Sequence, residues 1–169
     1  MRILIVAALC ICSEIAGAQN TRSQLGTVSQ SVMSSKIDIV YRRPVARGRP
    51  LFGSLMKWGE IWTPSADSAA RITFSTPVEI NGSKLGAGSY SMWAVPDSVS
   101  WIVIFSNVSE VFHRNYPGEG GDALRVRAAP AKGDYVETLM FAFPMVDADS
   151  ARLELRWGTT VVPLLIKAR

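Results

Sequence analysis

The chain has 169 residues, of which 48% are hydrophobic and 19% are charged, and it carries a formal net charge of +4. So small a positive excess does not require a nucleic-acid partner, and none is expected. The two cysteines, Cys10 and Cys12, lie in an N-terminal segment that is predicted to be removed. The mature chain then has no disulfide, no thiolate nucleophile and no cysteine metal ligand.

The N-terminus has the three parts of a signal peptide. Basic Met1-Arg2 precedes an apolar run from Ile3 to Cys12, and the small residues Ala16-Gly17-Ala18 follow. This order predicts a signal peptide over residues 1–18, cleavage before Gln19, and a periplasmic or secreted protein. The apolar run is about half of the roughly 20 residues that span a bilayer, which disfavours a membrane anchor. No other stretch is long enough to span, so no membrane span is expected after cleavage. Neither cysteine follows a small residue, which disfavours a lipid anchor.

Residues 19–35 are rich in Ser, Thr and Gln, which predicts a flexible lead. A single domain is predicted over residues 36–169, where apolar residues recur at every second position, the period of a strand with one buried face. Four segments show this alternation: Ile37–Tyr41, Ile72–Phe74, Leu124–Ala128 and Leu153–Trp157. Two apolar runs, 101–105 and 139–143, predict central strands covered on both sides.

Turn signals separate these strands. Asn81-Gly82 is typical of a two-residue hairpin turn in which both residues have positive φ. The last predicted strand, Thr160–Ile166, contains Pro163, which places it at an edge or a bulge. At most one short helix is predicted, near Leu51–Trp58. Eight to ten antiparallel strands at this spacing predict an all-β fold, a β-sandwich or a jelly roll.

Residues for catalysis are few. His113 is the only histidine, so a catalytic triad would depend on it, and it is interpreted as a histidine without a chemical role. No glycine-rich phosphate loop is present, and neither a cofactor nor a metal site is expected. A hydrolase remains an alternative, because folding could bring Asp67 or Glu60 together with a second carboxylate.

The densest group of charges follows the first predicted strand, where four arginines fall between Arg42 and Arg49. Guanidinium groups suit carboxylates, phosphates and sulfates. The other interpretation is that these arginines pair with carbonyls and carboxylates of their own loop, or are only solvated. Trp62 lies in a polar, loop-like passage, so it is the tryptophan predicted to line a pocket, whereas Trp101 and Trp157 fit core positions.

These residues predict a non-enzymatic, exported domain with a groove bordered by Arg43, Arg47, Arg49, Trp62 and Asp67. Its ligand would be a small molecule, anionic or sugar-like, a polyanion or a protein. The alternatives are the carboxylate hydrolase and a structural envelope-interaction domain without a small-ligand site.

Several motifs together resemble the bacterial domain-of-unknown-function family 2911: Tyr41-Arg42-Arg43-Pro44, Arg47-Gly48-Arg49, Trp58-Gly59 and Gly88-Ser89-Tyr90-Ser91. The resemblance covers about residues 37–166. It implies export and a compact domain, and it supplies no catalytic residues. After Trp62, family members tend to read arginine and then Gly-Ala-Asn, whereas this chain reads Thr63-Pro64-Ser65-Ala66-Asp67. The polarity of any pocket formed by this passage is therefore altered.

Overall fold

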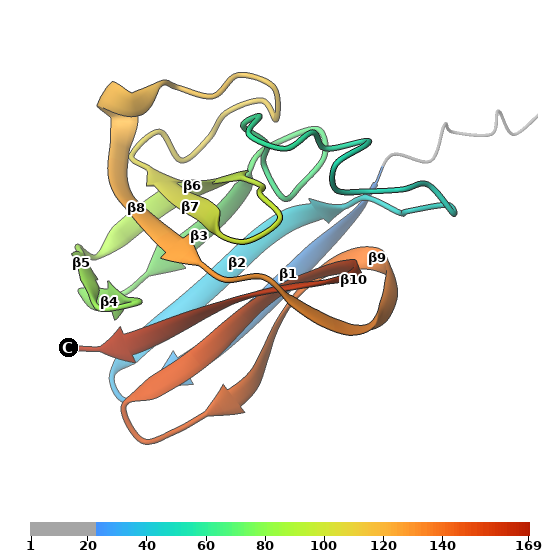
Figure 1. Ribbon diagram of the computed structural model, residues 1–169. Helices are drawn as coiled ribbons and strands as arrows, with labels where there is room; N and C mark the ends of the chain where they lie inside the picture. Colours follow the sequence, from blue (N-terminus) through green and yellow to red (C-terminus); the bar gives the residue numbers. More distant parts are fainter. Residues whose placement is uncertain (1–22) are drawn as a thin grey trace, which may run out of the picture.

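A computed structural model describes residues 23–169, which fold as two antiparallel sheets packed face to face (Figure 1). This confirms the predicted β-sandwich. The first sheet has the strand order β1-β2-β3-β6-β7-β8 and the second β5-β4-β10-β9. The strands are β1 (Gln24–Val32), β2 (Ser35–Arg43), β3 (Ala70–Phe74), β4 (Val78–Ile80), β5 (Ser83–Leu85), β6 (Gly88–Val95), β7 (Trp101–Ser106), β8 (Asp122–Ala128), β9 (Ala131–Val146) and β10 (Ser150–Ala168). The predicted signal peptide lies outside the described residues.

A flexible lead was predicted over residues 19–35, but most of the described part of this segment is a strand. Gln24–Val32 is β1, and it pairs residue by residue with β2 across a tight turn at Met33-Ser34. Most of its side chains are polar and at least partly exposed. Its backbone hydrogen bonds to β2 hold it at the edge of the sheet, a contribution that a search for buried apolar residues does not detect.

The core lies between the inner faces of the two sheets. Ile37, Ile39 and Tyr41 of β2 are buried there, as the two-residue period predicted. The ring of Tyr41 meets that of Phe141 in β9 edge to face, with ring centres 4.8 Å apart. The Tyr41 hydroxyl also accepts a hydrogen bond of 3.2 Å from the backbone N–H of Phe141. One tyrosine therefore links the two sheets by packing and by a hydrogen bond.

The two continuous apolar runs have different surroundings. Ile104 of β7 packs with Trp93 on the outer face of its sheet, where Val111 and Tyr116 of the β7–β8 connection cover them. The prediction that residues 101–105 are covered on both sides is confirmed. For residues 139–143 the prediction of a central strand is wrong, because β9 is the edge strand of its sheet.

The turns and breaks of the chain agree with most of the predictions. Asn81 and Gly82 have φ values of 47° and 82° and connect β4 to β5, as predicted. Pro163 lies between the last residue that β10 pairs with β9 and the first that it pairs with β4. Residues 51–58 form hydrogen-bonded turns instead of a short helix, and a 3-10 turn occurs at Glu119–Gly121. Within residues 23–169, no helix has the length and apolar character to cross a membrane.

Candidate functional site

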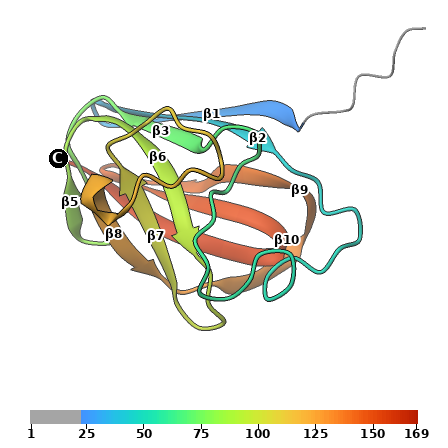
Figure 2. The same ribbon diagram turned by 90° about the horizontal axis from the view of Figure 1, so that it is seen from above.

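The arginine-rich segment begins where β2 ends and crosses to the other sheet. The backbone of Ala46 donates to the carbonyl oxygen of Glu137 at 2.8 Å, and that of Leu139 donates to the oxygen of Pro44 at 2.9 Å. Val45 forms an isolated bridge with Thr138 of β9. Figure 2 shows the long β2–β3 connection leaving the sandwich at this end, beside β9 and β10. The segment therefore has a fixed base.

A tight turn then orients the arginines. Arg47 and Gly48 both have positive φ, 54° and 67°, which reverses the chain. The guanidinium group of Arg49 donates to the carbonyl oxygens of Ala46 at 2.8 Å and Val45 at 2.7 Å. Arg49 thus does what the alternative interpretation predicted and ties its own loop. Both bonds go to neutral carbonyl oxygens, so they leave the guanidinium group with its positive charge.

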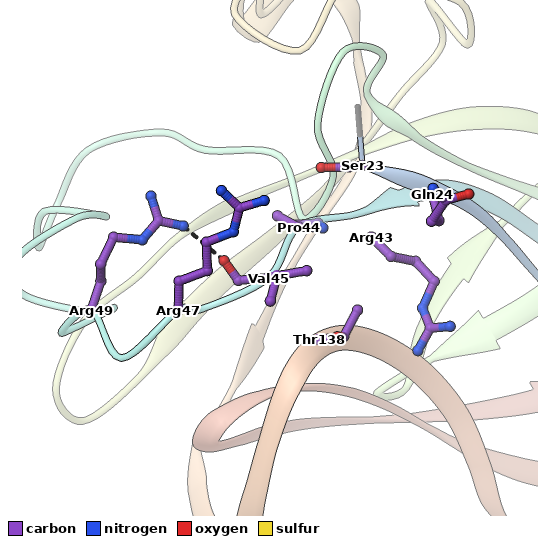
Figure 3. Close-up of a pocket in the computed structure, with 8 residues that line it drawn as sticks. All are labelled: Ser23, Gln24, Arg43, Pro44, Val45, Arg47, Arg49 and Thr138. Carbon is purple, nitrogen blue, oxygen red and sulfur yellow. Dashed lines mark hydrogen bonds between the residues drawn. The ribbon is translucent and has the colours of Figure 1, made fainter. Parts of the chain in front are cut away.

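The three predicted arginines line one open hollow of about 530 Å³, here called the arginine hollow. Its lining is Ser23, Gln24, Arg43, Pro44, Val45, Arg47, Arg49 and Thr138. Figure 3 shows the guanidinium groups of Arg47 and Arg49 toward one end and that of Arg43 turned toward β9, where it donates to the oxygen of Leu139 at 3.4 Å. The hollow combines segments that are almost 100 residues apart in the sequence.

Charge in the arginine hollow is predominantly positive. In residues 23–169, none of Arg43, Arg47 and Arg49 forms an ion pair with a carboxylate. The nearest acid is Glu137, whose carboxylate accepts hydrogen bonds from the Tyr135 hydroxyl and from the backbone N–H of Arg47, the latter 2.7 Å long. These two donors, with the nearby charge of Arg49, hold the pKa of Glu137 below its usual value. Residues 19–22 contain no acid.

Trp62 does not line the arginine hollow. Its ring packs against Phe52, Trp101 and Trp157 with centre distances of 5.8, 6.4 and 6.1 Å, and the contact with Trp157 is stacked. Its backbone exchanges two hydrogen bonds with Ala94 of β6. The structure therefore places Trp62 at the margin of the core, away from the position that the sequence predicted.

The passage after Trp62 begins with three buried residues, Thr63, Pro64 and Ser65. The hydroxyl of Thr63 donates to the oxygen of Met92 at 2.7 Å and accepts from the N–H of Ala70 at 3.1 Å. The hydroxyl of Ser65 accepts from the backbone of Arg42 at 2.8 Å. The hydroxyls of Thr63 and Ser65 therefore hold the loop to the sheet.

Asp67 lies in a different hollow from the arginines, one lined also by Arg71, Glu110 and Phe112. Two carboxylates do approach this hollow, as the hydrolase alternative requires. Glu110, however, pairs with Arg71 at 2.6 Å and is 79% exposed, which is unlike the apolar pocket that keeps a catalytic acid protonated. Glu60, the other candidate, is exposed and pairs with Lys57 at 3.8 Å. No specific feature of this hollow favours hydrolysis.

His113 lies in the connection between β7 and β8, and the centre of its ring is 4.3 Å from that of Phe112. In the described part of the chain, no three His, Cys, Asp or Glu residues are grouped closely enough to hold a metal ion. The structure thus brings together three of the five predicted site residues and leaves Trp62 and Asp67 elsewhere.

The fold and the site define a class of protein: a two-sheet antiparallel β-sandwich with a basic hollow at the end where β2 crosses to β9. The profile of one family, described as "Protein of unknown function (DUF2911)", matches residues 23–166. The chain belongs to this family, as the sequence motifs indicated. No curated protein and no solved structure matches the chain in comparisons of sequence and fold.

Sequence reasoning missed several residues around the hollow. Thr138 and Glu137 are too distant in sequence from the arginines to be connected with them before the sheets are packed. Trp58 carried a local signal, because it lies between Gly53 and Gly59, both of which have positive φ. Glycine adopts positive φ without the steric cost that other residues have, so two such glycines allow the chain to turn on both sides of this tryptophan.

Proposed function

We propose that this domain binds an anionic group, a carboxylate, sulfate or phosphate, in the arginine hollow, and that it does so as an exported, non-enzymatic protein. One observation carries the proposal: three guanidinium groups line a single hollow and form no ion pair with a carboxylate in residues 23–169. Like charges placed together repel one another, and a bound anion removes that cost.

The chemistry of the lining supports this proposal. A guanidinium group presents several N–H donors in a plane, which match the oxygens of a carboxylate, sulfate or phosphate. Arg49 is already held by two carbonyl oxygens, so it loses little further rotational freedom when a ligand binds. The hydroxyl of Thr138 and the amide of Gln24 line the same hollow and can donate hydrogen bonds.

Two-dimensional NMR of the arginine Nε–H groups tests the proposal, with inorganic sulfate as the probe at constant ionic strength. We expect sulfate to shift the signals of Arg47 and Arg49, because charge-assisted hydrogen bonds form at these groups. The double variant Arg47→Gln/Arg49→Gln should also lose the shifts of backbone amides near Thr138.

A matched control removes the same charge elsewhere. Arg114 and Arg127 are exposed, and neither lines the arginine hollow. The variant Arg114→Gln/Arg127→Gln should therefore retain the full response to sulfate. Equal responses to sulfate from arginines over the whole surface would show only diffuse attraction and would contradict a defined site.

A further inference from the structure

Trp58 is an exposed tryptophan in a fixed position. Trp58 is 47% exposed. The indole packs on the backbone of Gly53, so closely that a Cβ at that position would lie 2.5 Å from its Nε1 atom. The N–H of Gly53 bonds to the oxygen of Met56 at 2.8 Å, and that of Gly59 to Pro96 at 2.9 Å. The flat ring is thus held at the surface.

Trp58 lies between two further hollows that continue from the arginine hollow. The first, of about 440 Å³, shares Arg49 with the arginine hollow and is also lined by Trp58 and Tyr135. The second, of about 240 Å³, shares Trp58, Thr159 and Thr160 with the first and reaches Lys132. The three hollows, here called the basic band, lie next to one another, because each shares lining residues with the next.

The basic band has the charge and shape of a site for an extended anion. Its lining contains four basic side chains, Arg43, Arg47, Arg49 and Lys132, and one acid, Asp97. Asp97 is already engaged by the backbone N–H of Val99 at 2.8 Å. The arginine end of the path is therefore positive, the other end contains both Lys132 and Asp97, and aromatic rings lie between the two ends.

We propose that the basic band binds an acidic oligosaccharide, with a sugar ring stacked on Trp58 and acidic groups at the arginines and Lys132. This inference rests on the proposed anion binding and names its ligand class. A pyranose ring has an apolar C–H face that covers an indole, and its hydroxyls pair with donors and acceptors such as Thr159 and Thr160. A polyanion without rings, such as polyphosphate, leaves Trp58 and the 57%-exposed Tyr135 uncovered.

The local backbone of β10 places the two threonines at the surface. Gly158 has a φ of 58°, and the pairing of β10 with β9 shifts register on both sides of it. This irregularity leaves Trp157 buried in the core and Thr159 exposed beside Trp58. Bulges commonly redirect side chains next to binding sites.

The test is isothermal titration calorimetry of the mature protein with a hexamer of galacturonic acid. The comparison ligands are the galacturonate monomer and a neutral hexasaccharide, maltohexaose. We expect the wild-type protein to bind the acidic hexamer at least 10-fold more tightly than either one. The tryptophan fluorescence should change with the acidic hexamer and should not change with polyglutamate.

Three aromatic variants and one arginine double variant complete the test. Trp58→Ala should weaken binding of the hexamer at least 10-fold, and Trp58→Phe should weaken it less, because a smaller ring still offers a stacking face. Phe112→Ala removes an aromatic ring that is 51% exposed and lines a different hollow, and it should not change the affinity. Arg47→Gln/Arg49→Gln should also weaken binding at least 10-fold.

Several results would overturn the inference. The first is that the wild-type protein binds the acidic hexamer no more tightly than the monomer. The second is that it binds the acidic hexamer no more tightly than maltohexaose. The third is that Trp58→Ala leaves the affinity for the acidic hexamer unchanged. The sulfate experiment separates this failure from that of the proposed function. If sulfate shifts the arginine signals while the hexamer binds no better than the monomer, anion binding stands and the glycan assignment falls. If sulfate produces no shift, both fall.

Discussion

Replacing Trp62 by alanine should destabilise the domain, because the ring closes one side of an aromatic cluster. Its partners are Phe52, Trp101 and Trp157, at centre distances between 5.8 and 6.4 Å. Truncation of a core aromatic to alanine costs about 3 to 5 kcal/mol. Since Trp62 is only partly buried, we expect the low end of that range, about 3 kcal/mol. For a domain of this size that is a fall in Tm of about 6 to 12 °C.

Urea unfolding monitored by circular dichroism measures this loss directly. Trp58→Ala is the matched control, since it removes the same side chain from an exposed loop position, and we expect it to cost roughly 1 kcal/mol. If Trp62→Ala leaves the unfolding free energy unchanged and instead abolishes sulfate binding, Trp62 contacts the ligand. That result would show that Trp62 does not stabilise the domain by packing against its aromatic neighbours.

Two substitutions test the fold, and one mass measurement tests the proposed export. Gly82→Val should cost about 1 kcal/mol or more, because valine must adopt the positive φ of 82° at the hairpin turn; an unchanged Tm would count against it. Tyr41→Phe should cost about 1 to 3 kcal/mol by leaving the N–H of Phe141 without its buried partner, and urea unfolding would show it. Exported protein should begin at Gln19 by intact-mass measurement, whereas retention of Met1 would contradict signal cleavage.

The two-residue period of β2, β3, β8 and β10 was sufficient to predict the β-sandwich, since each strand buries one face. The same criterion missed β1, a polar edge strand held by backbone hydrogen bonds to β2. It also misplaced β9, because an apolar run does not show whether a second strand pairs on its far side. Both assignments depend on which distant strands pair with β1 and β9, and the local sequence contains little information about such pairing.

The candidate site was predicted in part, for physical reasons that differ from residue to residue. Arg43, Arg47 and Arg49 share a hollow because one short segment carries all three. Trp62 was assigned to a pocket because its neighbours are polar, but the hydroxyls of Thr63 and Ser65 bond to backbone groups, and the ring of Trp62 packs in an aromatic cluster. Trp58 was not predicted to be a site residue, because only the packing of its ring on Gly53 shows that the exposed indole has a fixed position.

The central claim is that the arginines of one hollow bind an anion. The most direct measurement is the affinity for citrate, by calorimetry at physiological salt, of wild-type protein and of the two charge-matched double variants. We expect Arg47→Gln/Arg49→Gln to bind at least about 10-fold more weakly, or about 1.4 kcal/mol, and Arg114→Gln/Arg127→Gln to bind as the wild type does. Equal weakening in both variants would contradict the claim, because it would show that net charge attracts the anion and the hollow does not.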